Sequence, residues 1–187
     1  GLAAHAHKPN AGSRIVACCD TSEDEQNRSR EKYGPDIFIT DDYQTLLKQD
    51  LDAMFICTPD FLHEEMAIAA LEAGQAIYLE KPMAITIAGC DRILETAVRT
   101  NGKLYLGHNM RHMAFVLKMK ELIDDGAIGA VKAGWCRHFV GHGGDFYFKD
   151  WHADRRLCTG LLLQKATHDI DVMHWLCGGY SELVNAL

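Results

Sequence analysis

The sequence predicts an α/β protein in which strands and helices alternate around a parallel sheet. Short apolar runs are followed by helix-length segments, several of which end at a glycine, as at Gly34, Gly74 and Gly102. The run over 51–60, "LDAMFICTPD", is apolar almost throughout, which is typical of a strand covered on both faces. Elements of these lengths, joined by short loops, favour parallel strands with right-handed crossovers.

The first half of the chain repeats a strand–helix unit. Thr21 or Ser22 is expected to cap the first polar helix, because a side-chain oxygen there can accept from free backbone amides. Residues 1–107 are therefore expected to form one domain. Its strands are expected at 14–20, 36–40, 51–60, 75–80 and 103–109, and its helices at 21–34, 41–49, 61–74 and 86–102.

The pattern changes after His108. Residues 108–187 are expected to be part of a second α/β domain. This domain is expected to be incomplete, because it ends on one new apolar strand, and an unpaired apolar edge strand favours aggregation. Its predicted elements are a helix over 114–126, a strand over 131–140, a loop over 141–160, a helix over 161–179 and the start of a strand over 182–187.

Composition limits the classes of partner. The net charge of -7 argues against nucleic acid, whose phosphates require clustered Lys and Arg. The chain has no run of about 18 apolar residues that would span a bilayer, so no membrane partner is expected. The seven cysteines include no C-x-x-C pair, which is typical of the reduced thiols of a cytoplasmic protein.

Two residues are candidates for contacts with a dinucleotide. Such a site needs a glycine-rich turn after its first strand, and an acid about 20 residues further on that binds the ribose hydroxyls. Gly1 and Asp20 have this separation, so Gly1 is a candidate for the last glycine of a turn whose earlier part, with the first strand, is missing here. Asp20 favours NAD over NADP, because a carboxylate repels a 2′-phosphate. The alternative is a turn acid that caps the next helix.

Thr58 and Pro59 end an apolar run at the expected carboxyl edge of the sheet, where open parallel sheets bind ligands. His63 follows on the next helix and is a further candidate. The alternative for this stretch is an ordinary helix start capped by Asp60.

The segment "CTPDFLHEEMAIAALEAGQAIYLEKPMA" (57–84) resembles the glucose-fructose oxidoreductase, inositol dehydrogenase and MocA (Gfo/Idh/MocA) family. A strand ending in Thr-Pro, a histidine a few residues later and the triplet Glu80-Lys81-Pro82 occur together at that family's spacing. The likeness continues through "GHNMRH" and "GLLLQKATHDIDVMHWL" and so covers essentially the whole chain. A full member is about twice as long on ordinary domain sizes, so both ends look truncated.

The resemblance implies an NAD(P)-binding Rossmann domain over 1–107. It also implies a carboxyl-terminal α/β domain over 108–187 with an open, mostly antiparallel sheet. Members oxidise or reduce sugars and polyols, and the full-length protein is expected to be a homo-oligomer. Lys81 matches the family's catalytic lysine, His168 matches its catalytic histidine, and Pro82 matches a proline that is often cis.

The helix over 161–179 is expected to present a mostly polar face containing Gln164, His168 and Asp171, with Asp171 one turn from His168 to orient it. Many family members have an aspartate where this chain has Gln164, which cannot ionise. Lys165 either offers a second ammonium group to the substrate or pairs with Asp169 at i, i+4.

The remaining candidates follow from position and resemblance. Two histidine pairs, His108 with His112 and His138 with His142, have i, i+4 spacing but no accompanying Glu, so no metal is predicted. The loop over 141–160 is expected to form a lid or, alternatively, a pinned surface loop. The expected cofactor contacts are Gly1, Asp20, Thr58, Pro59, His63, Glu80, Lys81 and Asn109, and the expected substrate contacts are Lys81, Arg111, Trp151, Gln164, Lys165 and His168.

The sequence therefore predicts an oxidoreductase that transfers a hydride between NAD(P) and a sugar or polyol. Lys81, which can donate to the substrate oxygen or accept its proton, and His168 are placed at the reacting carbon. One alternative is a redox-neutral NAD-dependent glycosidase of the same fold. The other is a regulator that binds the dinucleotide without turnover.

Overall fold

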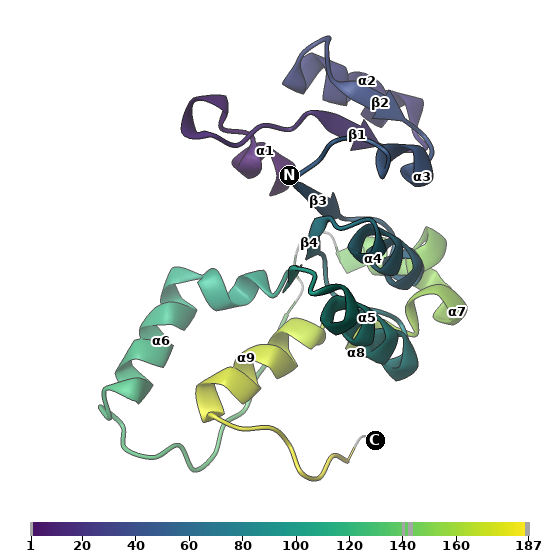
Figure 1. Cartoon of the computed structure of the whole chain (residues 1–187). Helices are drawn as coiled ribbons and strands as arrows, with labels where there is room; N and C mark the ends of the chain where they lie inside the picture. The colour runs from purple at the N-terminus through teal and green to yellow at the C-terminus, as the bar shows by residue number, and fades with distance from the viewer. Residues whose placement is uncertain (1, 140, 142–143, 186–187) are drawn as a thin grey trace.

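The computed structural model describes residues 2–139, 141 and 144–185 (Figure 1). Short strands and longer helices alternate through the first half, and the second half is helical with long irregular segments. In chain order, the first half contains α1 (Leu2–Ala6), η1 (Pro9–Ala11), β1 (Ala17–Cys19), α2 (Glu23–Tyr33), β2 (Phe38–Thr40), α3 (Tyr43–Leu46), β3 (Ala53–Ile56), η2 (Asp60–Leu62), α4 (His63–Glu72), β4 (Ala76–Leu79), α5 (Ile87–Thr100) and β5 (Leu104–Leu106).

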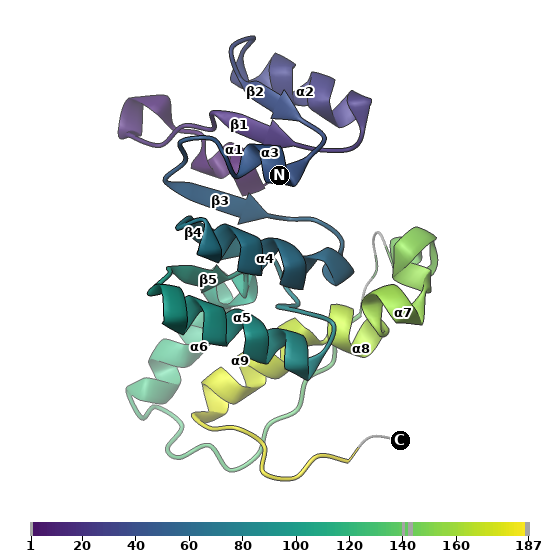
Figure 2. The same ribbon diagram turned by 45° about the vertical axis from the view of Figure 1, so that its right-hand side comes forward.

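All pairings between the named strands are parallel. β1 pairs with β2, and β3, β4 and β5 form a three-stranded sheet in that order. The register places Ile56 opposite Leu79 and Leu79 opposite Leu106. Helices α4 and α5 lie side by side over the three-stranded sheet (Figure 2). The predicted α/β class with a parallel sheet is confirmed.

The core lies between this sheet and the two helices. Ile56, Leu71, Leu79 and Ile93 are at most 2% exposed. Gly102 closes the loop after α5 against this core, because a Cβ at that position would lie 2.6 Å from Leu71 Cδ2.

The predicted cap of the first polar helix is confirmed, and the structure adds a second cap of the same kind. Ser22 is the cap of α2, and its hydroxyl accepts from the Glu25 amide at 3.5 Å. Thr86 caps α5 in the same way, accepting from Gly89 N at 2.9 Å. The expected Asp60 cap is wrong, since α4 has no side-chain cap and Asp60 begins the short η2 instead.

The second half departs from the predicted mixed domain. Among the described residues after Leu106 no strand is formed, so the expected antiparallel sheet is absent from these ranges. The elements are η3 (Asn109–His112), α6 (Ala114–Asp124), η4 (Gly144–Phe148), η5 (Asp150–Ala153), α7 (Arg155–Cys158), α8 (Leu161–Gln164) and α9 (Thr167–Cys177).

The strand expected over 131–140 is wrong for residues 131–139, and residue 140 lies outside the described part. This segment runs along α9. His138 Nδ1 donates to Asp169 Oδ1 at 2.9 Å, and a Cβ on Gly134 would meet Met173. A strand needs a neighbouring strand to bond with its backbone, and the described residues supply none. Residues 182–185 are likewise irregular, and 186–187 fall outside the description.

No helix within the described ranges is long and apolar enough to cross a bilayer.

Candidate functional site

The candidate site forms where the parallel strands end. The arrows of β1 and β3 point the same way in Figure 2, and β4 and β5 run parallel to β3. Asp20 follows β1, Thr58 follows β3, Lys81 follows β4 and His108 follows β5. Residues far apart in the sequence are therefore brought to one edge of the molecule, as expected for an open parallel sheet.

Lys81 lies on a turn that is braced from both sides. The Lys81–Pro82 peptide bond is cis, as the resemblance implied. The backbone amide of Lys81 donates to Glu80 Oε2 at 3.1 Å, and the Tyr78 hydroxyl donates to Glu80 Oε1 at 3.3 Å. Glu80 thus fixes the backbone that carries Lys81.

His63 braces the same turn from α4. Its ring is fully buried, with Nδ1 2.6 Å from the Pro82 carbonyl and Nε2 3.0 Å from the Thr58 carbonyl. Since a carbonyl oxygen only accepts, the ring donates to the carbonyl that faces its N–H. Both nitrogens face protein atoms, so His63, expected among the cofactor contacts, acts here on the backbone of the two neighbouring strand ends.

A break in the predicted long helix supplies the partner of Lys81. The helix expected over 161–179 is two helices, α8 and α9, separated at Lys165 and Ala166. The His168 amide lies 3.4 Å from the Lys165 carbonyl instead of bonding to Gln164. The Gln164 carbonyl is therefore free to accept from Lys81 Nζ at 2.7 Å, which ties the two halves of the chain together.

His168 lies at the start of α9, close enough to Lys81 for the charge of the lysine to act on its ring. It is 6% exposed, and its buried Nδ1 has no hydrogen-bond partner among the described residues. Burial, followed by the positive charges of Lys81 and Lys165, lowers the pKa of His168 to about 4. The imidazole is consequently neutral near pH 7 and able to accept a proton. Burial likewise lowers the pKa of the Lys81 ammonium group, although Asp60 and Glu80 oppose part of that shift.

The expected orientation of His168 by Asp171 is wrong. Asp171 instead accepts from Arg111 Nε at 2.7 Å and from its Nη2 at 2.5 Å, and His108 Nδ1 lies 2.8 Å from Asp171 Oδ1. Burial opposes ionisation of Asp171, but the hydrogen bonds from Arg111 prevail and lower its pKa. The guanidinium of Arg111 also lies over the Trp175 ring, 5.3 Å from its centroid. Arg111 is therefore held by protein groups, and His108 is the residue whose ring adjoins His168, at 6.4 Å between centroids.

The Gln164 side chain joins a second group of polar residues. It is 2% exposed, and Nε2 donates to His152 Nδ1 at 2.7 Å and to Asp60 Oδ2 at 3.3 Å. His152 stacks on Trp151 at 3.7 Å, which places the expected substrate residue Trp151 beside this group. Sequence reasoning missed Asp60 as part of the site. Asp60 follows the Thr58-Pro59 motif directly, a position that could have indicated it.

The remaining predicted cofactor residues lie along the strand ends. Asp20 Oδ1 accepts from the Ser22 amide at 2.9 Å, so part of its carboxylate serves the turn, as the capping alternative expected. Pro59 begins the turn into η2, and Asn109 is exposed at the start of η3. Gly1 lies outside the described residues.

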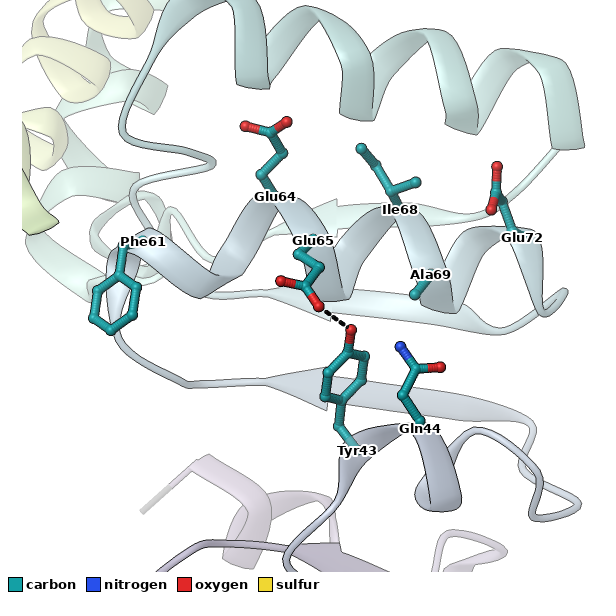
Figure 3. A pocket seen from close by; sticks show the side chains of 8 residues that line it. All are labelled: Tyr43, Gln44, Phe61, Glu64, Glu65, Ile68, Ala69 and Glu72. Carbon is teal, nitrogen blue, oxygen red and sulfur yellow. Dashed lines mark hydrogen bonds between the residues drawn. The ribbon is translucent and has the colours of Figure 1, made fainter.

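The pocket shown in Figure 3 is separate from the site around Lys81 and His168. It measures about 550 Å³ and lies between α3 and α4, lined by Tyr43, Phe61 and Glu65 among others. The Tyr43 hydroxyl donates to Glu65 there. Neither Lys81 nor His168 reaches it. Within the described ranges, no group of three or more His, Cys, Asp or Glu side chains is arranged to hold a metal ion.

A parallel sheet with polar residues gathered at the carboxyl ends of its strands defines a Rossmann-type nucleotide-binding protein. Residues 1–108 match the family described as "Oxidoreductase family, NAD-binding Rossmann fold", and residues 116–187 match the GFO/IDH/MocA C-terminal domain. The chain belongs to the Gfo/Idh/MocA oxidoreductase family, which confirms the resemblance.

Individual relatives agree with this family. Inositol 2-dehydrogenase of Salmonella paratyphi B is 31% identical over 169 residues, covering 89% of this chain and 47% of that protein. The 2,7-anhydro-N-acetylneuraminate hydratase of Mediterraneibacter gnavus is 33% identical over 181 residues, covering 95% and 46%. The myo-inositol 2-dehydrogenase structure from Lactobacillus plantarum shares the fold, with a TM-score of 0.78 at 23% identity over 89% of this chain and 49% of that one. The chain spans about half the length of these relatives.

The low pKa of His168 predicts how stability depends on pH. The folded-state pKa, about 4, lies below the ordinary 6.5, so between these values the unfolded chain binds the proton more readily. We expect acidification from pH 6.5 toward 4 to lower the free energy of unfolding, and His168→Gln to flatten that dependence. Urea unfolding at pH 7, 6 and 5 measures it, with His5→Gln, an exposed histidine, as the control. Equal pH dependence in both variants would contradict the assignment.

Proposed function

We propose that this protein transfers a hydride between a nicotinamide dinucleotide and a secondary alcohol of a sugar or polyol. The placement of Lys81 carries this proposal. Its ammonium group lies at the carboxyl edge of the sheet, is held by the Gln164 carbonyl and lies beside a neutral histidine, His168. A hydrogen-bond donor next to a proton acceptor is what oxidation of an alcohol requires.

The two side chains divide the work at the reacting carbon. Lys81 donates a hydrogen bond to the substrate oxygen and fixes its position. His168 accepts the hydroxyl proton, and its buried Nδ1 has no hydrogen-bond partner among the described residues, so that nitrogen does not tie the ring to another protein group. The nicotinamide, when bound, supplies the hydride acceptor. In the reverse direction His168 returns the proton to the carbonyl oxygen.

The residues present fit a dinucleotide. Thr58 Oγ1 is buried at the end of β3 without a hydrogen-bond partner among the described residues, which suits a polar group supplied by a ligand. Asp20, Pro59 and Asn109 are proposed as the other contacts. We assign Asp20 to the ribose hydroxyls, which favours NAD over NADP.

The cofactor preference can be tested at Asp20. We expect Asp20→Ala to raise the Kd for NAD by about tenfold or more, because hydrogen bonds to a charged group contribute about 1.5–3 kcal/mol. The Kd for NADP should rise less or fall, since the repulsion of its phosphate is removed. Calorimetric titration measures both constants, and Asp36→Ala, an exposed loop acid, is the control. An unchanged Kd for NAD would place the ribose elsewhere.

The activity itself is tested by incubating the protein with NAD and a panel of inositols, neutral sugars and sugar acids while nicotinamide absorbance is followed. Reduction of NAD with at least one substrate, together with loss of that reaction in Lys81→Met, is the expected result. Binding of NAD without turnover of any compound would instead support a dinucleotide-sensing regulator.

A redox-neutral reaction is the second candidate. The relative from Mediterraneibacter gnavus, whose alignment covers 95% of this chain, is a hydratase by name. A hydratase adds or removes water, a reaction without net oxidation. The same assay separates the two reactions, because substrate would be consumed without accumulation of NADH. Analysis of the products by mass spectrometry would then show a change by one water rather than by two hydrogens.

A further inference from the structure

Lys165 is a cation beside the site that the described protein leaves without an acidic partner. Its side chain is partly buried, and no carboxylate among the described residues lies within ion-pair distance of it. The pairing with Asp169 that the sequence allowed is not formed. Asp169 is instead bonded by His138 Nδ1 at 2.9 Å, and its side chain is only 14% exposed.

The helix break fixes where Lys165 lies. Its backbone directly follows Gln164, whose carbonyl accepts from Lys81, and its own carbonyl is 3.4 Å from the His168 amide. Lys165 is therefore at the junction of the two proposed catalytic residues. Its charge is felt by both of them, since it lowers the pKa of Lys81 and of His168.

The acidic side chains near the site accept hydrogen bonds from residues other than Lys165. Asp60 accepts from the Gln164 side chain, Glu80 accepts from the Lys81 amide and from Tyr78, and Asp171 is held by Arg111. Asp60 and Glu80 offset the charge of Lys81, and Arg111 offsets Asp171. Among the charged groups that the structure describes at this site, Lys165 has no acid facing it, and a partly buried ammonium group is most stable when an anion does.

We infer that Lys165 binds a carboxylate of the substrate, so that the preferred substrates are sugar acids such as uronates rather than neutral sugars or polyols. This inference rests on the proposed function, because it assumes a sugar ring with its reacting carbon between Lys81 and His168. A carboxylate on that ring then lies within reach of the long side chain of residue 165. Lys165 becomes the residue that sets substrate class, while Lys81 and His168 carry the reaction.

The test compares sugars that differ only in the carboxylate. D-glucuronate is paired with D-glucose, and D-galacturonate with D-galactose. For each, the Kd is measured by calorimetry in the presence of NAD, and KM and kcat are measured by nicotinamide absorbance. We expect the acids to have Kd and KM values at least about tenfold lower than their neutral partners, and this advantage to shrink at high salt.

Variants assign the preference to Lys165. Lys165→Gln should raise the Kd and KM of the sugar acids about tenfold and leave the Kd and KM of the neutral sugars nearly unchanged. Lys165→Arg, which keeps the positive charge, should keep most of the preference for the acids. Lys103→Gln is the matched control, since Lys103 is exposed just before β5 at the opposite edge of the sheet.

The outcomes separate this inference from the proposed function. Turnover of neutral sugars with no preference for acids would overturn the role of Lys165 and leave the proposed oxidoreductase intact. An equal loss on acids and neutral sugars in Lys165→Gln would also overturn it. Failure of every sugar to bind or react would count against both. The comparison of acids with neutral sugars on the unmodified protein stands even if a variant folds poorly.

Discussion

Replacing Lys81 with Met is expected to lower kcat by about 10²–10⁴-fold, the range typical for loss of a positioned proton-transfer or hydrogen-bonding group. Met has nearly the same length and no charge, and it suits a partly buried position. The variant keeps the braced turn, because Glu80 bonds to the backbone amide of residue 81 and His63 faces the Pro82 carbonyl.

Steady-state kinetics on the best substrate from the panel measures this effect, with circular dichroism to check folding. Lys103→Met, an exposed lysine at the other edge of the sheet, should retain full activity. A rise in KM with unchanged kcat would show that Lys81 only binds substrate. Wild-type values for both constants would remove Lys81 from the mechanism.

Asp171→Asn is expected to lower the free energy of unfolding by about 2 kcal/mol, because it removes the charge from a partly buried ion pair whose hydrogen bonds, being to a charged group, contribute about 1.5–3 kcal/mol. The Asp171 side chain is 10% exposed and faces both Arg111 and His108. The Arg111 side chain is 38% exposed and can partly rehydrate, which keeps the loss at the lower end of the usual range.

Urea unfolding at pH 7 measures the difference. The control is Asp145→Asn, which removes an ion pair with Lys149 whose side chains are 66% and 61% exposed, so its loss should stay below about 1 kcal/mol. Equal losses in the two variants would mean that the Asp171 contacts contribute no more than a surface pair.

The first half of the fold could be predicted from sequence because its signals are local. The apolar run before Thr58 became β3, and the stretch that ends at Gly74 became α4. The side chain of Ser22 bonds to the backbone three residues further on, at the start of α2. Gly102, just after α5, packs closely against one buried leucine, Leu71. Periodicity and capping chemistry are sufficient where neighbours in sequence decide the structure.

The errors lie where distant partners decide. The stretch from Leu161 to Cys177 has good helical spacing, and its break at Lys165 and Ala166 accompanies a contact with Lys81, 83 positions away from Gln164. Asp171 was predicted to orient the histidine one turn before it, but a guanidinium from η3 holds it instead. The segment over 131–139 has the composition of a strand, yet it lies along α9 with its aromatic residues Trp135 and Phe139 exposed.

The Lys81 contact with residue 164 is made through the main chain. A backbone carbonyl is present whatever side chain the residue carries, so substitution of Gln164 by another acceptor such as Asp or Glu leaves the tether of Lys81 in place. The acceptor of the proposed catalytic lysine therefore does not depend on which side chain residue 164 carries. The side chain of residue 164 is a separate matter, because its buried amide donates to Asp60 Oδ2 and to His152 Nδ1 and an acid there would lose both contacts.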